Sequence, residues 1–443
     1  MLKTFSLGGI HPPENKLSAR KGLKDLPLPK MVTIPVSQHI GAPAKILVKR
    51  GEEVKVGQLI AESAGFISAN IYASVSGKVK KIDQVVDASG YRKESIVISV
   101  EGDEWLDTID RSDILNKTIE LSPQEIIDKV AEAGIVGLGG ATFPAHVKLM
   151  VPPGKKAEVL IVNGVECEPY LTSDHQLMLE RGEQVIVGVQ IVLKALGIDK
   201  AIIGIENNKE DAIKHLRMIT KNHPNIKICP LKVQYPQGGE KQLIKATIDK
   251  EVPSGALPIE VGAVVQNVAT IFAIYEAVQK NKPLISRIVT VTGKSFSNPS
   301  NWRCRIGIPI SHLIEQAGGL PEDTEKVISG GPMMGKALTN LDAPITKGTS
   351  GVLLIRSLEA RRKEMQNCIR CCKCVRVCPM GLEPYLLMQL TERNYHDRLE
   401  KEDVMDCIEC GSCSYTCPSY RPLLDYIRIG KKDVGQIMRS RKK

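Results

Sequence analysis

The sequence predicts a multidomain α/β protein that ends in a helical, cysteine-rich domain, and three observations support this. The chain has 443 residues, whereas a single hydrophobic core rarely organises more than about 250 to 300. Strand-like and helical stretches alternate between residues 115 and 283, as in an α/β layer fold. Eight of the twelve cysteines fall into two short clusters near the carboxyl end.

Composition narrows the class further. Hydrophobic residues make up 42% of the chain and charged residues 25%, as in soluble globular proteins, which excludes disordered and collagen-like classes. No stretch has the length and apolarity of a signal peptide or a membrane-spanning helix, so we expect a non-spanning, cytoplasmic protein. Clustered thiols in such a compartment favour metal ligation over disulfides.

The formal net charge of +10 is unevenly distributed. The segment after Pro418 carries eight Lys or Arg against two Asp, and we treat residues 423–443 as a basic tail. Such a tail can attract an anionic membrane or an acidic partner, or it can simply keep the chain soluble. Aromatic residues are not interleaved with the basic ones, so nucleic acid is not an expected partner.

Residues 1–30 form an amino-terminal lead that contains GGIHPPENK, and residues 31–104 alternate short β-prone runs with glycine turns. This β-rich module resembles the flattened barrel, or barrel-sandwich hybrid, of biotinyl and lipoyl carrier domains. Those domains modify a lysine in a hairpin that corresponds to residues 64–74, where this chain has no lysine. We therefore expect a structural platform and not a swinging arm.

Two further units follow. Ser122 and Glu125 fit a capping box at the start of the α/β region, which covers residues 115–283. Residues 286–355 form a strand, helix and strand unit whose size suits a small β-grasp domain. A charged hinge, RSLEARRKEMQN, leads into the cysteine region at residues 360–422.

The two cysteine clusters repeat one spacing, C-x2-C-x2-C-x3-C-P, with a displacement of 39 residues. The first contains Cys368, Cys371, Cys374 and Cys378, and the second contains Cys407, Cys410, Cys413 and Cys417. Cys372 has no counterpart in the second cluster, so we expect it to bind no metal. This spacing is typical of two 4Fe-4S clusters, and the alternative is a pair of structural zinc sites.

In two-cluster ferredoxins the fourth cysteine of each motif binds the other cluster. Cluster 1 is therefore predicted to take Cys368, Cys371, Cys374 and Cys417, and cluster 2 to take Cys407, Cys410, Cys413 and Cys378. The residues between the two motifs have helical patterns, which favours an all-helical ferredoxin domain. Because such clusters transfer single electrons, another cofactor must exchange electron pairs.

The α/β region offers four candidate blocks for that cofactor. They are GLGGATFPAHVK at residues 137–148, NGVECEP from Asn163, YPQGGEKQL from Tyr235, and VQNVAT with Gln266 and Asn267. Glycines allow backbone amides to approach a phosphate or a flavin ring, and polar residues after strands suit ligand binding in open α/β sheets. Taken singly, each block is as well explained by a turn, an acidic loop or a helix cap.

The order of these blocks resembles the flavin and NADH site of the flavoprotein subunit of respiratory complex I, which implies a Rossmann-like flavin domain. The GGPMMG unit resembles an SLBB domain of the β-grasp type. Together with the lead, the barrel and the two-cluster ferredoxin region, the whole chain resembles the C subunits of Rnf electron-transport complexes.

The resemblance implies a set of cofactor-binding residues. For FMN these are Gly137, Gly139, Lys148, Asn163, Glu166, Tyr235, Gly238, Gln266 and Asn267. For NADH they are Gly140, Phe143, Glu168 and Glu240, with Glu168 and Glu240 as the catalytic pair that orients the nicotinamide. The chain departs from the complex I pattern at Leu138, Val165 and Gly239.

The implied function is electron transfer between NAD(H), FMN and two 4Fe-4S clusters in a membrane-bound, ion-translocating ferredoxin:NAD+ oxidoreductase. Its implied partners are the membrane and ferredoxin-like subunits of that complex, with ferredoxin itself acting indirectly, at the cytoplasmic face of the inner membrane. Two alternatives stay open. One is a soluble reductase of the cobalamin-reductase type, and the other is an iron-sulfur relay that has lost nucleotide binding, which the three departures would suit.

Overall fold

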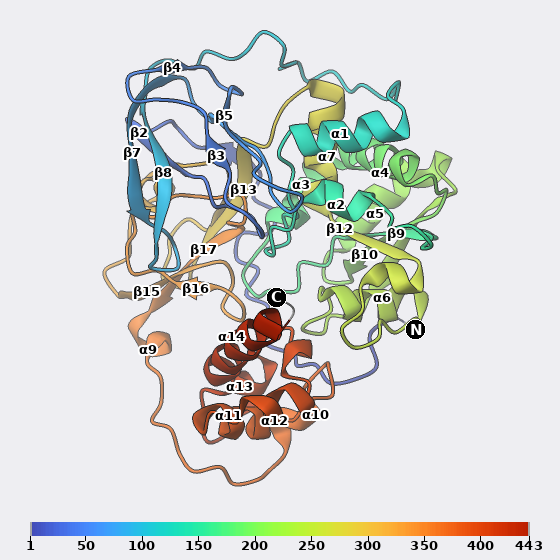
Figure 1. Ribbon diagram of the computed structural model, residues 1–443, viewed down its shortest axis with the longest axis vertical. Helices are drawn as coiled ribbons and strands as arrows, with labels where there is room; N and C mark the ends of the chain where they lie inside the picture. The colour runs from blue at the N-terminus through green and yellow to red at the C-terminus, as the bar shows by residue number, and fades with distance from the viewer. Residues whose placement is uncertain (1, 442–443) are drawn as a thin grey trace.

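The computed structural model describes residues 2–441, which form four packed regions. Figure 1 shows the β-rich module and a second β-sheet region on one side, the α/β region on the other, and the helical cysteine region below them. Among the described residues, no helix combines the length and apolarity needed to cross a membrane.

The β-rich module contains two small sheets that enclose an apolar interior. The first has the order β2 (Met31–Pro35), β8 (Arg92–Val100), β7 (Gly77–Val86) and β4 (Glu53–Val54), and the second β3 (Lys45–Ile46), β5 (Leu59–Glu62) and β6 (Ile71–Tyr72). Val32 and Ile34 of β2 and Ile96 and Ile98 of β8 are fully buried, whereas Thr33 between them is less so. This period of two is what turns one face of each strand inward.

The α/β region has a parallel sheet with the order β11 (Ile226–Leu231), β10 (Ala201–Glu206), β9 (Val159–Asn163) and β12 (Ala263–Asn267). Its helices are α1 (Pro123–Glu132), α2 (Ala145–Leu149), α3 (Ser173–Glu180), α4 (Gly182–Leu196), α5 (Glu210–Ile219), α6 (Glu240–Ile248) and α7 (Val268–Lys280). The predicted capping box at Ser122 and Glu125 is confirmed. The chain builds the sheet outward from β9 to β11 and then places β12 on the other side of β9. Ligands of open α/β sheets bind at such a switch in strand order.

A six-stranded mixed sheet forms the third region, together with α8 (Ile310–Ala317) and the short α9 (Ser357–Ala360). Its order is β1 (Leu23–Asp25), β14 (Ser300–Arg305), β13 (Ser286–Thr292), β17 (Gly351–Arg356), β15 (Thr324–Ser329) and β16 (Lys336–Ala337). The edge strand β1 comes from the lead and pairs in parallel with β14. The lead is thus built into this sheet and is not a separate segment.

The helical region contains α10 (Lys373–Arg376), α11 (Pro384–Glu392), α12 (His396–Lys401), α13 (Ser412–Thr416) and α14 (Leu423–Arg441). The segment that we treated as a basic tail forms α14, and its buried Leu423, Ile427 and Val434 share one core with the cysteines. Arg441 lies 2.7 Å from Glu400. The described part of the tail, up to Arg441, is therefore an integral helix of this region, because its apolar face is needed to complete the core.

Candidate functional site

The neighbouring strands β9 and β12 of the α/β sheet end side by side at the switch point. Asn163 at the end of β9 is the register partner of Asn267 at the end of β12. The Asn267 Oδ1 atom accepts a hydrogen bond from the Ala269 amide at 2.9 Å and so caps α7. The Asn163 Nδ2 atom donates to the Gly238 carbonyl at 2.9 Å. Three of the four blocks identified in the sequence therefore meet at this edge.

The glycine-rich loop, residues 137–144, supplies the fourth block. Gly139 and Gly140 are exposed, and Gly140 has a φ of 110°, which a residue with a side chain rarely adopts. A Cβ atom on Gly139 would lie 3.4 Å from Asn267 Cβ. The loop thus brings a bare stretch of backbone close to Asn267, where a planar or phosphate-bearing ligand can approach.

One buried polar atom at this edge lacks a partner. Gln266 is 2% exposed, and its Nε2 atom makes no hydrogen bond in the described residues. An unpaired buried amide is costly and uncommon in folded proteins, and a bound ligand is one of the explanations for it. The residues at the switch point therefore fit a polar, planar group such as the ring of FMN.

Two other residues predicted to contact FMN are engaged within the chain. Glu166 accepts hydrogen bonds from the backbone amides of Asp174 at 2.8 Å and His175 at 3.1 Å, and so satisfies the start of α3. Lys148 forms an ion pair with Glu240 at 2.6 Å. Both residues belong to the blocks identified in the sequence, and each side chain holds another group of the chain.

Glu168 lies between the α/β region and the GGPMMG loop, residues 330–335. Its carboxylate accepts hydrogen bonds from the amides of Met333 at 3.2 Å and Met334 at 2.7 Å, and burial raises its pKa to about 7. The two carboxylates proposed to orient NADH, Glu168 and Glu240, therefore both have partners inside the chain. Sequence reasoning missed the partner of Glu168 because Met333 is 165 positions away.

The predicted ligands of cluster 2 gather in one place. Cys378, Cys407, Cys410 and Cys413 line a single small cavity whose other walls are mostly apolar. Burial raises the pKa of Cys407 to about 11, and the neighbouring thiols of Cys410 and Cys378 also act to raise it. The fourth cysteine of the first motif thus lies among the first three of the second, which fits the exchange of ligands that the spacing predicts.

The cysteines of cluster 1 occupy a more open position. Burial raises the pKa of Cys374, and the nearby thiol of Cys417 adds to this. Cys368 and Cys371 are half-buried and Cys372 is exposed.

Tyr235 joins the flavin crevice to cluster 2. Its hydroxyl donates to the Cys410 carbonyl at 2.8 Å, and its ring packs in one apolar group with Ile10, Met333 and Cys410. We expected Tyr235 to contact FMN, and the structure directs its hydroxyl toward the cysteine loop. Nothing in the spacing of either motif indicated this contact.

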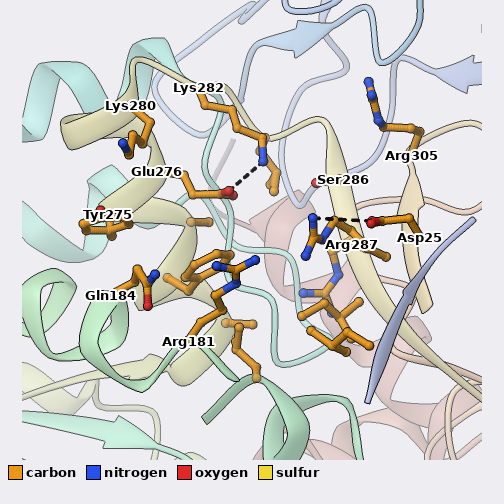
Figure 2. A pocket seen from close by; sticks show the side chains of 18 of the residues that line it. Asp25, Arg181, Gln184, Tyr275, Glu276, Lys280, Lys282, Ser286, Arg287 and Arg305 are labelled. Carbon is orange, nitrogen blue, oxygen red and sulfur yellow. Dashed lines mark hydrogen bonds and ion pairs between the residues drawn. The ribbon is translucent and has the colours of Figure 1, made fainter. Parts of the chain in front are cut away.

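A larger cavity, of about 510 Å³, lies behind the glycine-rich loop, between β1, α7 and β14. Figure 2 shows Lys282 paired with Glu276, and their charged atoms lie 2.6 Å apart. Asp25 also pairs with Arg303 at 3.4 Å. Arg287, at its inner end, donates to the Leu138 carbonyl at 3.1 Å. Because most of the charged side chains around the cavity pair with one another, we assign it no ligand and regard it as a support behind the loop.

Comparison with protein families accounts for most of the chain. Residues 3–103 match the RnfC barrel sandwich hybrid domain, and residues 130–276 match the Nuo51 FMN-binding domain. Residues 288–337 match the SLBB domain, and residues 360–419 match a 4Fe-4S dicluster domain. These matches confirm the predicted fold class and the predicted cofactors, which are FMN and two 4Fe-4S clusters.

Sequence identity to curated relatives shows the family to which the chain belongs. One is the C subunit of the proton-translocating ferredoxin:NAD(+) oxidoreductase complex of Clostridium ljungdahlii, which is 47% identical over 98% of this chain and 94% of its own length. Another is the C subunit of the Na(+)-translocating complex of Acetobacterium woodii, which is 47% identical over 96% of each chain. The chain belongs to this family of C subunits. The C-subunit family was the resemblance stated from the sequence, and it is confirmed.

Solved structures support the fold of this Rnf-type protein independently. An NAD+-reducing [NiFe]-hydrogenase in its H2-reduced state superposes with a TM-score of 0.52 at 18% identity, over 71% of this chain and 63% of that chain. The air-oxidized form of an NAD+-reducing [NiFe]-hydrogenase gives the same TM-score at 19% identity, over 69% of this chain and 63% of that chain. At such identities the likeness concerns the fold alone.

Proposed function

We propose that this chain is the NADH-handling subunit of an ion-translocating ferredoxin:NAD+ oxidoreductase and transfers electrons between NAD(H), FMN and two 4Fe-4S clusters. The observation that supports this is the hydrogen bond from the Tyr235 hydroxyl to the Cys410 carbonyl, which joins a residue predicted to contact FMN to a predicted ligand of cluster 2. Electron transfer between cofactors requires this proximity. The names of the relatives give the reaction of the whole complex.

The FMN-binding residues are proposed to act in two ways. The open backbone of Gly139 and the unpaired amide of Gln266 receive the ring, while Gly137 keeps the loop closed through its backbone hydrogen bonds with Phe143 and Thr142. Asn163, Asn267 and Gly238 keep the crevice in shape through the hydrogen bonds between them. Lys148 attracts phosphate, and Glu166 fixes the loop after β9. When bound, FMN would accept electrons in pairs and release them singly.

The NADH contacts follow from the same crevice. Gly140 and the half-buried Phe143 lie on the open side of the glycine-rich loop. The Glu240 side chain is 39% exposed beside Lys148, so its carboxylate can accept a hydrogen bond from a ribose hydroxyl. Glu168 is proposed to act less directly, by holding the GGPMMG loop against the crevice.

The partners and location are proposed at the level of the family. The relatives' names describe one member of a multi-subunit complex. We propose that membrane and ferredoxin-like subunits dock the chain on the cytoplasmic side of the membrane, that NADH is its direct substrate, and that ferredoxin reaches it only through other subunits. The two relatives are named for different ions, so the proposal covers ion translocation without specifying the ion.

Anaerobic reconstitution followed by titration with NADH tests the proposed function. The expected sample contains about eight irons and one FMN per chain. NADH should bleach the flavin band and then produce the paramagnetic signals of reduced clusters. A sample that holds both cofactors but shows no change on addition of NADH would support the alternative function, an iron-sulfur relay without nucleotide binding. Full activity as a soluble cobalamin reductase without membrane partners would instead support the other alternative.

A further inference from the structure

We propose that Lys16, in the amino-terminal lead, is a positioning residue of the flavin crevice that holds the loop of residues 164–171 in its binding shape. The loop carries Glu166 and Glu168 and follows β9 directly. This inference rests on the proposed function, because it concerns the affinity and the potential of the flavin bound there. It gives the lead a role in the site itself.

The contacts of Lys16 are concentrated on this loop. Its Nζ atom donates to three backbone carbonyls, those of Glu166 at 2.8 Å, Glu168 at 2.9 Å and Leu171 at 2.7 Å. An ammonium group has three N–H donors, so all of them are used. Lys16 as a whole is half-buried, but its ammonium group is turned inward. Burial lowers the pKa of this group to about 8. The ammonium group is therefore mostly protonated at neutral pH.

A second lysine holds the same loop from the other side. Lys209 is 2% exposed, and its Nζ atom donates to the Val165 carbonyl at 2.8 Å and lies 3.6 Å from Glu206. The two ammonium groups therefore draw four loop carbonyls toward them. Within residues 2–441, the backbone amides of Glu166, Cys167 and Glu168 donate to no other backbone group. Those N–H groups are left available to an acceptor on a ligand.

The lead presents Lys16 from a fixed position. The Glu14 carbonyl accepts a hydrogen bond from the Tyr170 amide at 2.8 Å, and the Ser18 hydroxyl lies 2.6 Å from the Thr172 hydroxyl. The segment on each side of Lys16 is thus bound to the same stretch of chain that Lys16 contacts. If the ammonium group is removed, three carbonyls lose their donor while the backbone around them stays tethered, so the loop must rearrange locally.

The charge of Lys16 adds an electrostatic effect to the geometric one. A flavin that has gained electrons carries more negative charge than the oxidised ring. A positive charge behind the loop therefore favours the reduced form and raises the potential of the flavin. A neutral residue of similar length should lower that potential, whereas a positively charged replacement should preserve it.

The test compares Lys16→Met, Lys16→Gln and Lys16→Arg with a matched control, Lys3→Met. Lys3 also belongs to the lead and donates to a backbone carbonyl, that of Thr247 at 2.9 Å, but at the far end of α6. On the full reconstituted chain, three quantities are measured: the FMN dissociation constant, the flavin midpoint potential and the iron content.

We expect Lys16→Met to weaken FMN binding by about tenfold or more and to lower the flavin potential, with iron content unchanged. Lys16→Arg should keep the potential and recover part of the affinity, and Lys3→Met should match the wild type. If the methionine variant does not fold, Lys16→Gln provides the same test, because its amide keeps two N–H donors without the charge. Wild-type affinity and potential in the neutral variant would overturn the inference. A wild-type chain unable to bind FMN would instead refute the proposed function.

Discussion

The two sets of cysteines have identical spacing and different surroundings. In the set of cluster 2, Cys378, Cys410 and Cys413 are each 8% exposed, and Cys410 packs against Tyr235 of the flavin domain. In the set of cluster 1, only Cys374 is buried to that degree, and the other three cysteines are half-buried. The spacing of the repeat determines which thiols can share a cluster, and the packing around each set determines which cluster can exchange electrons with the flavin.

The same contrast appears in the residues that surround each set. A Cβ atom on Gly8 of the lead would lie 2.6 Å from the backbone of Cys378, and one on Gly411 would lie 3.0 Å from the Met333 carbonyl. Three regions of the molecule thus close around cluster 2. We infer an order of transfer from flavin to cluster 2 to cluster 1, with the last near the surface where a partner can receive electrons.

The largest effects are expected when one cysteine ligand is removed from each set, and the two variants should differ in which remaining cluster NADH can reduce. Cys410→Ala and Cys368→Ala should each reduce iron content to about four per chain. In the Cys410 variant the remaining cluster 1 should lose its rapid reduction by NADH, because its route to the flavin is interrupted. In the Cys368 variant cluster 2 should still be reduced. Rapid mixing with NADH followed by paramagnetic detection measures the rate at which the remaining cluster is reduced in each variant. Equal rates in the two variants would contradict the order of transfer.

Titration of Glu168, which binds the GGPMMG loop beside cluster 2, should make the stability of the chain depend on pH. Burial raises its pKa to about 7, above the value of about 4.3 in an unfolded chain. The folded chain therefore binds more protons between these values, and the free energy of unfolding falls as pH rises through that window and then stays level. Relative to wild type, Glu168→Gln should gain stability between about pH 4 and 7, on the order of a few kcal/mol at most. Thermal unfolding at several pH values measures this, and a constant difference would contradict it.

A smaller effect is expected for Tyr235→Phe, which removes the hydroxyl that donates to the Cys410 carbonyl while keeping the ring. One lost hydrogen bond costs about 0.5 to 1.5 kcal/mol, so the chain should fold and keep its iron. The potential of cluster 2 should shift and that of cluster 1 should not, because only the loop of Cys410 loses a contact. A redox titration followed by paramagnetic resonance resolves the two, and a shift in cluster 1 alone would argue against our ligand assignment.

The smallest effect is expected for Cys372→Ser. This cysteine is exposed and has a φ of 56°, and the repeat gives it no partner. Iron content and the potentials of both clusters should remain those of the wild type. A loss of iron in this variant would show that cluster 1 uses a ligand set different from the one that the spacing predicts.

Sequence reasoning succeeded where the determinants are local. The repeated C-x2-C-x2-C-x3-C-P spacing identified the 4Fe-4S dicluster domain, and the capping box at Ser122 needs only a residue three positions away. The fold class followed from strand and helix patterns together with the family resemblance. The assignments of FMN and NADH contacts to particular residues stay predictions, and so do the domain boundaries.

The contacts that could not be predicted join residues far apart in the chain. Lys16 meets Leu171 across 155 positions, and Tyr235 meets Cys410 across 175. A lysine in a polar lead and a tyrosine before a proline have many possible roles, and only the packed structure selects one. The basic tail was misjudged for the same reason, since the apolar face of α14 matters only when α11 lies beside it.

The lead also constrains the order in which the molecule can be completed. It forms bridges from Lys3 to Leu231 and from Ile10 to Tyr235, pairs β1 with β14, and donates a hydrogen bond from the Gly9 amide to the Val377 carbonyl. During synthesis the lead emerges before all of these partners, and Val377 is the last of them along the chain. The lead can therefore complete its contacts only after the other regions have been made, and docking it joins them to one another.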